Sequence, residues 1–241
     1  MIERAIDIWD SSVGYSKRDP IKYFIKFLSQ KIPLTLLRRL MPYSLISKEF
    51  ANLKHAVLVS QRSQVWDEVL SFNLNEPITF VEFGVFEGES IRYFAAKNQH
   101  SQSKFLGLDS FEGLPEKWAG NEAGFFSTSS NLPVIADARV QFVKGWFIDT
   151  WEQVENKIID PTPLIVHFDA DLYSSTLFAL IKVDGLKRDY YAIFDEFCGE
   201  ESRALADYMS AFQAKVEFIC KQNWRGYPEV VLCKILPYQS I

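Results

Sequence analysis

The stretch PLIVHFDADLYSS, residues 163–175, decides the fold. An apolar run typical of a buried strand leads directly into two carboxylates and then into a serine pair typical of a helix start. A second stretch, YAIFDEF at residues 191–197, repeats the order of apolar run and carboxylates. If the two runs are neighbouring parallel strands, Asp169, Asp195 and Glu196 converge at one edge of the sheet.

A convergence of carboxylates predicts a cation. Adjacent strands lie roughly 4.8 Å apart, and carboxylates held that close repel, which raises a pKa unless a positive charge lies among them. An all-oxygen set favours Mg²⁺, Mn²⁺ or Ca²⁺ over zinc. The alternative is that the acids only cap helices beginning at Ser174 and near Glu200, because Asp and Glu favour helix N-termini.

The chain from about residue 78 onward alternates short apolar runs with helix-like stretches, which indicates an α/β fold with a mostly parallel sheet. The seven predicted strands are residues 78–83, 104–109, 139–145, 163–169, 191–197, 215–220 and 229–235. Only about eight residues separate the last two runs, too few for a helical crossover. The last strand is therefore predicted to be antiparallel.

Residues 1–72 differ from the rest and are predicted to form an N-terminal helical extension, followed by a domain at residues 73–241. Apolar residues recur there at helical spacing in Ile21, Phe24, Ile25 and Leu28, and again in Val65, Val69 and Leu70. Its basic residues suit anionic lipid or an acidic partner, but a solvated face or a surface for a homodimer or higher homo-oligomer is favoured. Residues 111–137 form a long connection typical of a lid.

The amino-acid composition restricts the classes of function that this protein can have. Of the 241 residues, 48% are hydrophobic, enough for a substantial core. No apolar run approaches the ~20 residues of a membrane span, and the N-terminus lacks a signal-peptide pattern, so we expect a cytoplasmic protein. The net charge is −5, with 26 of the 31 acidic residues after residue 54, which disfavours nucleic acid as a partner. Cys198, Cys220 and Cys233 show no metal-ligand spacing and are predicted to be buried thiols.

The segment VEFGVFEGES, residues 81–90, follows the first predicted strand with a glycine turn. Gly84 suits a sharp strand-to-helix turn and the close approach of a ligand to the backbone, and Gly88 opens the helix. Phe86 stands where a G-x-G-x-x-G fingerprint has its second glycine, which argues against a nicotinamide-dependent oxidoreductase.

Asp109 ends the second predicted strand about 25 residues after the glycine turn, where an acidic residue can accept hydrogen bonds from both ribose hydroxyls of an adenosine cofactor. The alternative is a turn residue before Ser110. Trp146 and Phe147 follow the third strand and could flank an adenine ring, or could be core aromatics.

These segments resemble one family, the class I S-adenosylmethionine-dependent methyltransferases, and within it the macrocin O-methyltransferase-like branch that modifies sugars on natural products. The matching motifs are VEFGVFEGES, LDSFEGLPEKW (residues 108–118), KGWFIDT (residues 144–150), DADLYSST (residues 169–176) and FDEF (residues 194–197). They occur in the expected order on the expected elements and cover most of residues 78–200.

The resemblance implies a Rossmann-like fold, S-adenosylmethionine as cofactor and Mg²⁺ or another divalent cation. Residues predicted to contact the cofactor are Glu82, Gly84, Gly88, Ser90, Asp109, Ser110, Trp146 and Phe147. The predicted metal ligands are Asp169, Asp195 and Glu196. The family more usually has two aspartates at the last pair, so Glu196 is a departure.

The reaction implied is methyl transfer to a hydroxyl of a sugar or related small molecule. Asp169 is the first candidate for the base and Asp171 the second. His167, two residues before Asp169 on the same strand face, is a third candidate or a supporting group. Leu172 stands where related catechol methyltransferases have a lysine, which argues against copying their mechanism.

A binding or scaffold protein that keeps this fold but has lost catalysis is the alternative function. The departure at Glu196, the missing lysine and the basic N-terminal segment motivate it.

Overall fold

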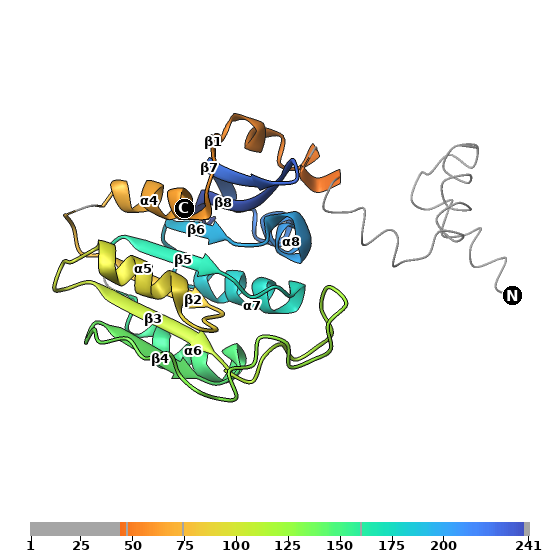
Figure 1. Ribbon diagram of the computed structural model, residues 1–241. Coiled ribbons are helices and arrows are strands. Elements are labelled where there is room, and N and C mark those ends of the chain that lie inside the picture. Colours follow the sequence, from red (N-terminus) through yellow and green to blue (C-terminus); the bar gives the residue numbers. More distant parts are fainter. Residues whose placement is uncertain (1–43, 47, 74, 160, 239–241) are drawn as a thin grey trace, which may run out of the picture. The chain divides into compact units, whose positions relative to one another are not determined.

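The computed structural model describes residues 44–46, 48–73, 75–159 and 161–238. Within them, one sheet runs in the order β1-β7-β8-β6-β5-β2-β3-β4 (Figure 1). The predicted helical positions of residues 21–28 and the basic residues of 17–39 lie outside the described residues. None of the described helices is both long enough and apolar enough to cross a membrane.

The centre of the sheet is parallel, as predicted. β2 (Thr79–Phe83) pairs with β3 (Lys104–Asp109) and β5 (Leu164–Phe168), while β4 (Val140–Lys144) pairs with β3 and β6 (Tyr190–Phe194) with β5. Every residue of β2 and β5 is buried, as expected for parallel strands covered on both faces.

The last strand is antiparallel, which confirms the hairpin. β7 (Lys215–Trp224) turns at residues 225–226 into β8 (Tyr227–Leu236), and β8 inserts antiparallel between β7 and β6. The prediction of seven strands was one too few. A short strand β1 (Val57–Val59) adds parallel to the outer edge of β7, and three residues are too few for a sequence pattern to reveal.

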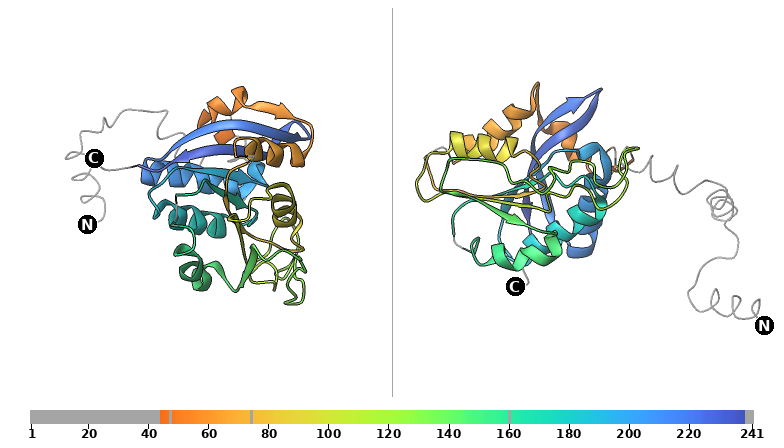
Figure 2. Two further views of the ribbon diagram at one scale, coloured as in Figure 1. Left: turned by 90° about the vertical axis from the view of Figure 1, so that its left-hand side faces the viewer. Right: turned by 60° about the horizontal axis from the view of Figure 1, so that its bottom comes forward.

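Helices cover both faces of the sheet (Figure 2). On one face lie α4 (Arg62–Ser71) and α5 (Glu89–Lys97), and their apolar side chains form one core cluster with the sheet. On the other face lie α6 (Phe147–Glu155), α7 (Tyr173–Asp184) and α8 (Ser202–Phe212), which form the second cluster. Two further short helices are η1 (Ala51–His55), which precedes β1, and η2 (Phe197–Glu201), which follows β6.

Strand order reverses beside β2, because the chain continues from β2 to β3 on one side and from β5 to β6 on the other. In open α/β sheets, ligands bind outside the carboxyl ends of the strands at such a point. The topology therefore marks the edge at which β2 and β5 end as the place for a site.

Two buried thiols agree with the prediction for cysteine. Cys220 and Cys233 are buried and free, whereas Cys198 is also free but only partly buried, because it lies in the irregular η2 segment.

Candidate active site

A cavity of about 590 Å³ opens at this carboxyl edge, beside the ends of β2, β3, β5 and β6. Most of the predicted site residues line it, namely Gly84, Ser90, Asp109, Ser110, Trp146, Phe147, Asp169, Asp171, Asp195 and Glu196. His167, Glu82 and Gly88 do not. The sheet thus brings the glycine turn and the carboxylates into one cavity.

The two aspartates follow directly from the strands that carry them. The amide of Asp169 donates to the Phe83 carbonyl at 3.0 Å, and the amide of Asp195 donates to the Phe168 carbonyl at 3.1 Å. These bonds continue the parallel ladders one residue beyond β5 and β6. Asp169 and Asp195 therefore lie on neighbouring strands at the same level of the edge.

The carboxylates of this edge repel one another. Burial and the charge of Asp195 raise the pKa of Asp169 well above its ordinary value and that of Asp171 to about 7. Burial and the charges of Asp171 and Glu229 raise the pKa of Glu196 to about 8. The cluster holds more negative charge than its protein surroundings neutralise, and a bound cation would relieve it.

Beneath the cavity, His167 and Glu82 form an ion pair between β5 and β2. Nδ1 of His167 lies 2.8 Å from Oε1 of Glu82, and both side chains are fully buried. Burial lowers the pKa of His167, but the carboxylates of Asp195 and Glu82 outweigh it and raise the pKa to about 10. This favours the imidazolium form of His167 at neutral pH, although burial also raises the pKa of its partner Glu82. Glu82 reaches the cavity only through the hydroxyl of Ser90, which donates to it.

Gly84 makes the turn that follows β2 with a φ of +91°. A Cβ at this position would lie 1.9 Å from the carbonyl oxygen of Asp169. Both the left-handed backbone and the lack of space therefore require glycine. Gly88 has a φ of +75° and caps the N-terminus of α5, so its role is to start the helix.

Asp109 holds the loops beside the glycine turn. Its Oδ2 atom accepts hydrogen bonds from the amides of Val85 at 2.7 Å and Phe86 at 2.9 Å, and its Oδ1 atom accepts one from the amide of Phe111 at 2.7 Å. This is the turn role weighed as the alternative. Because each carboxylate oxygen carries two lone pairs, Oδ1 keeps one acceptor position for a ligand.

Four aromatic side chains line the cavity. Two of them are Trp146 and Phe147, and the Phe147 ring packs edge-on against Phe83 with centroids 5.2 Å apart. The other two, Phe86 and Phe126, pack edge-on against each other with centroids 5.4 Å apart. Both of these phenylalanines have a positive φ, +49° and +66°. The prediction that residues 111–137 act as a lid stays a prediction, although Phe126 comes from that connection.

Arg62 lines the cavity, but the sequence did not predict it as a site residue. It is the first residue of α4, and its guanidinium contacts Asp195, a residue 133 positions away. The helical spacing of Val65, Val69 and Leu70 correctly predicted α4, but nothing in that pattern places its first residue in a site. Phe126 and Glu89 also line the cavity and were not predicted.

Glu201 is a further missed carboxylate. It is fully buried, and its Oε2 atom accepts a hydrogen bond from the Glu196 amide at 3.1 Å. Burial and the charge of Asp169 raise its pKa well above the ordinary value. This hydrogen bond from Glu201 fixes the position of the Glu196 backbone.

The residues present fit a divalent cation. Oδ1 of Asp195 is buried and has no hydrogen-bond partner within the described residues. Among the described residues, the group whose ligand atoms lie within 4.8 Å of one another is Glu82, His167 and Asp169, and two of its members, His167 and Glu82, are bonded to each other. The predicted oxygen ligands Asp169, Asp195 and Glu196 suit a hard cation and all line the cavity, but they do not form such a group, so binding one ion by all three would require their side chains to move closer together.

Comparison with known proteins gives one family match. The family model described as Macrocin-O-methyltransferase (TylF) matches residues 52–219. No curated protein matches the chain.

Several solved structures resemble the fold. The O-methyltransferase NovP is 24% identical with a TM-score of 0.50, covering 70% of this chain and 75% of its own. CalS11, a calicheamicin methyltransferase, is 18% identical with a TM-score of 0.50, covering 94% and 96%. Cofactor-bound Rv0187 from MTB is 14% identical with a TM-score of 0.50, covering 93% and 100%. At these identities the likeness shows a shared fold.

Proposed function

Because this chain belongs to the macrocin-O-methyltransferase family and is an S-adenosylmethionine-dependent methyltransferase, we propose that it methylates a hydroxyl of a sugar or related natural-product small molecule with the aid of Mg²⁺ or another divalent cation. One observation supports this most: the Gly84 turn and the carboxylates of Asp169, Asp171, Asp195 and Glu196 line the same cavity. A cofactor held at the turn would face the carboxylates.

The cofactor side of the cavity has the features that S-adenosylmethionine needs. Gly84 leaves the backbone accessible, and Oδ1 of Asp109 retains an acceptor position for a ribose hydroxyl. Trp146 is 39% exposed within the cavity wall and offers a face for adenine. Ser90 and Ser110 also line the cavity. The bound cofactor supplies the methyl group.

The acceptor side would hold the cation on Asp169, Asp195 and Glu196. A divalent cation there would lower the pKa of an acceptor hydroxyl, as metals do for water. The residues of the chain then have to align the hydroxyl and remove its proton. Glu196 follows Asp195 directly and lines the cavity, so its longer side chain is compatible with a ligand role.

We propose Asp169 as the base, with Asp171 as the second candidate. Both line the cavity, and the pKa of Asp171 is raised to about 7, which suits a base near neutral pH. A cation beside Asp169 would lower the raised pKa of that carboxyl towards the charged form that accepts a proton. His167 has a raised pKa, which favours its protonated form, and it does not line the cavity. Its proposed role is to support Asp195, whose Oδ1 atom lies 3.7 Å from its Nε2 atom.

Further proposals concern the whole protein. We propose a cytoplasmic homodimer or higher homo-oligomer without nucleic-acid partners, with residues 1–72 as a lid and dimerisation segment next to a methyltransferase domain at residues 73–241. Residues 57–71 nonetheless contribute β1 and α4 to the sheet and its cover. Size-exclusion chromatography with light scattering tests the oligomeric state.

A direct test combines two measurements. Calorimetry with S-adenosylmethionine should show binding by both the wild-type protein and Asp169→Asn, since that carboxylate lies on the acceptor side. Transfer of a labelled methyl group to acceptors with free sugar hydroxyls should require the wild-type residue and be abolished by a chelator. Binding without transfer across a broad acceptor panel would favour the scaffold alternative, and transfer indifferent to chelator would remove the metal from the proposal.

A further inference from the structure

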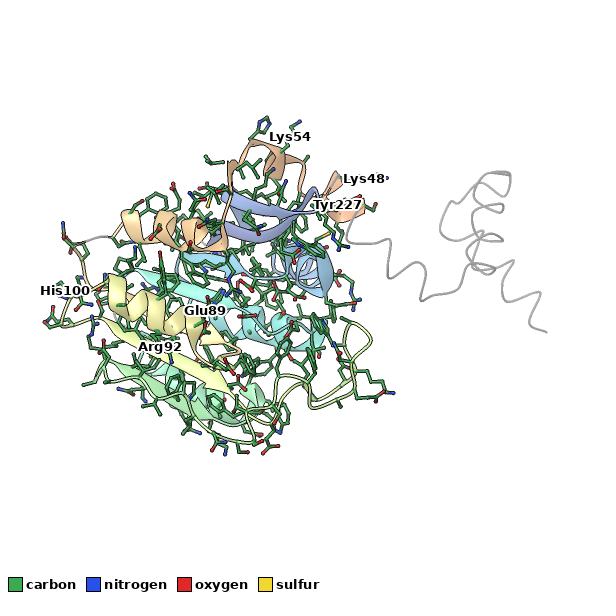
Figure 3. All side chains as sticks on the ribbon, in the orientation of Figure 1. Lys48, Lys54, Glu89, Arg92, His100 and Tyr227 are labelled. Atoms are coloured by element: carbon green, nitrogen blue, oxygen red, sulfur yellow. The ribbon has the colours of Figure 1, made fainter. Side chains whose placement is uncertain are left out.

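Arg62 brings a protein cation into the proposed metal site. Its Nη1 atom donates to Oδ2 of Asp195 at 2.9 Å, and its Nη2 atom lies 2.5 Å from Oε2 of Glu89. Glu89 is the first residue of α5 and is labelled in Figure 3. Arg62 thus joins the carboxylate edge of the cavity to the helix that follows the glycine turn.

The Arg62 guanidinium is only partly buried. The Arg62 side chain is 37% exposed and its charged group lies 4.9 Å from the centre of the Trp66 ring, one turn further along α4. A partly exposed arginine has solvent to rotate into, whereas His167, the other cation beside Asp195, is fully buried. Of these two protein cations, Arg62 is therefore the one that a bound metal ion can displace more readily.

Arg62 also acts on the same charges as a bound cation would. Burial by itself would raise the pKa of Asp195. The positive charges of His167 and Arg62 have the larger opposite effect, so the pKa of Asp195 lies below its ordinary value. The negative charge of Asp169 also contributes to raising the pKa of the Arg62 guanidinium. Arg62 neutralises Oδ2 of Asp195, while Oδ1 of the same carboxylate has no hydrogen-bond partner among the described residues.

We propose that Arg62 is a positioning residue that acts as a resident counter-cation of the carboxylate cluster and lowers its affinity for divalent cations. This inference rests on the proposed cation site. Arg62 keeps the cluster partly neutral before the cation binds, and it opposes the cation by charge repulsion. Removing the positive charge at residue 62 therefore strengthens divalent-cation binding.

Glu89 provides a test of opposite sign. The Glu89 side chain is 76% exposed, and its carboxylate pairs with Arg62 from the solvent side. When Glu89 is neutral, Asp195 is the carboxylate that Arg62 still pairs with. The electrostatic potential at the carboxylate cluster then becomes more positive. Neutralising Glu89 therefore weakens cation binding, although Glu89 and Arg62 are partners in one ion pair.

The experiment is a titration with Mn²⁺, followed by the electron paramagnetic resonance signal of free Mn²⁺, on four proteins. Compared with the wild type, Arg62→Gln should bind Mn²⁺ about tenfold more tightly, as expected for loss of one charge acting on a divalent ion through a partly exposed site. Arg62→Lys keeps the charge and should stay within about threefold of the wild type. Glu89→Gln should bind several-fold more weakly.

Several outcomes overturn the inference. Weaker binding by Arg62→Gln means that the arginine orders Asp195 for the cation, and equal gains for Gln and Lys mean that charge is not the cause. An absence of Mn²⁺ binding in both the wild type and Arg62→Gln also rejects it. Calorimetry with S-adenosylmethionine on the same samples reports separately on the methyltransferase site, and melting temperatures verify that each variant is folded.

Discussion

The backbone of Gly84 lies against the backbone of Asp169, so closely that a Cβ on the glycine would be 1.9 Å from the aspartate carbonyl oxygen. The glycine turn that is proposed to accept the cofactor and the strand end that carries the proposed base are therefore in direct contact. A displacement of the backbone at one of them would therefore move the other, whereas a change confined to the Asp169 side chain need not.

Gly84→Ala should destabilise the protein by about 2–4 kcal/mol, because it adds both backbone strain and a collision with main-chain atoms that cannot move alone. It should also abolish S-adenosylmethionine binding. Gly226→Ala is the matched control: its φ of +90° is nearly the same, but no atom lies within 4 Å of the added Cβ. Urea unfolding should therefore give a smaller loss, about 1 kcal/mol, for the control. Equal losses would contradict a steric role for residue 84.

His167→Gln should lower the free energy of unfolding by about 3–5 kcal/mol, because it leaves the carboxylate of Glu82 buried without its cation. The double variant Glu82→Gln/His167→Gln should lose less than the sum of the two single variants. Urea unfolding of all four proteins measures this coupling. Additive losses would show that the two side chains are not an ion pair.

Stability without a cation should fall as pH rises from about 5 to 8. The folded-state pKa values of Asp171, about 7, and Glu196, about 8, lie above those of the unfolded chain, so the unfolded state loses its protons first. His167, with a pKa of about 10, adds a change of the same sign above about pH 6.5.

Saturating Mg²⁺ should offset this loss, since it binds the deprotonated carboxylates. The melting temperature should therefore rise more with Mg²⁺ at pH 8 than at pH 5.5, and a rise of equal size at both would count against the site.

Glu196→Asp, which restores the residue more usual in the family, should keep Mn²⁺ affinity within about threefold, whereas Glu196→Ala should weaken it at least tenfold. Glu200→Ala is a nearby control, because Glu200 pairs with Arg203 and does not line the cavity. Calorimetric titration with Mn²⁺ measures all three. If Glu196→Ala binds as the control does, Glu196 is not a ligand.

Trp146→Ala should weaken S-adenosylmethionine binding about tenfold by removing the proposed adenine wall. Trp224→Ala removes an equally large exposed ring from the end of β7, outside the cavity, and should leave binding unchanged. Calorimetry compares the two. Unchanged binding by Trp146→Ala would place adenine elsewhere.

Local sequence patterns predicted most of this protein. Apolar runs such as those ending at Phe168 and Phe194 require burial on both faces, which only a central parallel sheet provides, and the short last connection forced the antiparallel hairpin. The carboxylates directly after those runs had to meet at one edge, because parallel strands end together.

Only the tertiary structure decided which residues lie beside the site residues and beside the outer strand. The pattern at residues 57–59 is too short to mark β1 as a strand, and Asp195 gains Arg62 as a partner from 133 positions away. The pairing of His167 with Glu82 depends on strand register, and it makes the histidine a buried cation. Periodicity and strand ends are local properties that a sequence displays, whereas charge state and ion pairing depend on packing between distant segments.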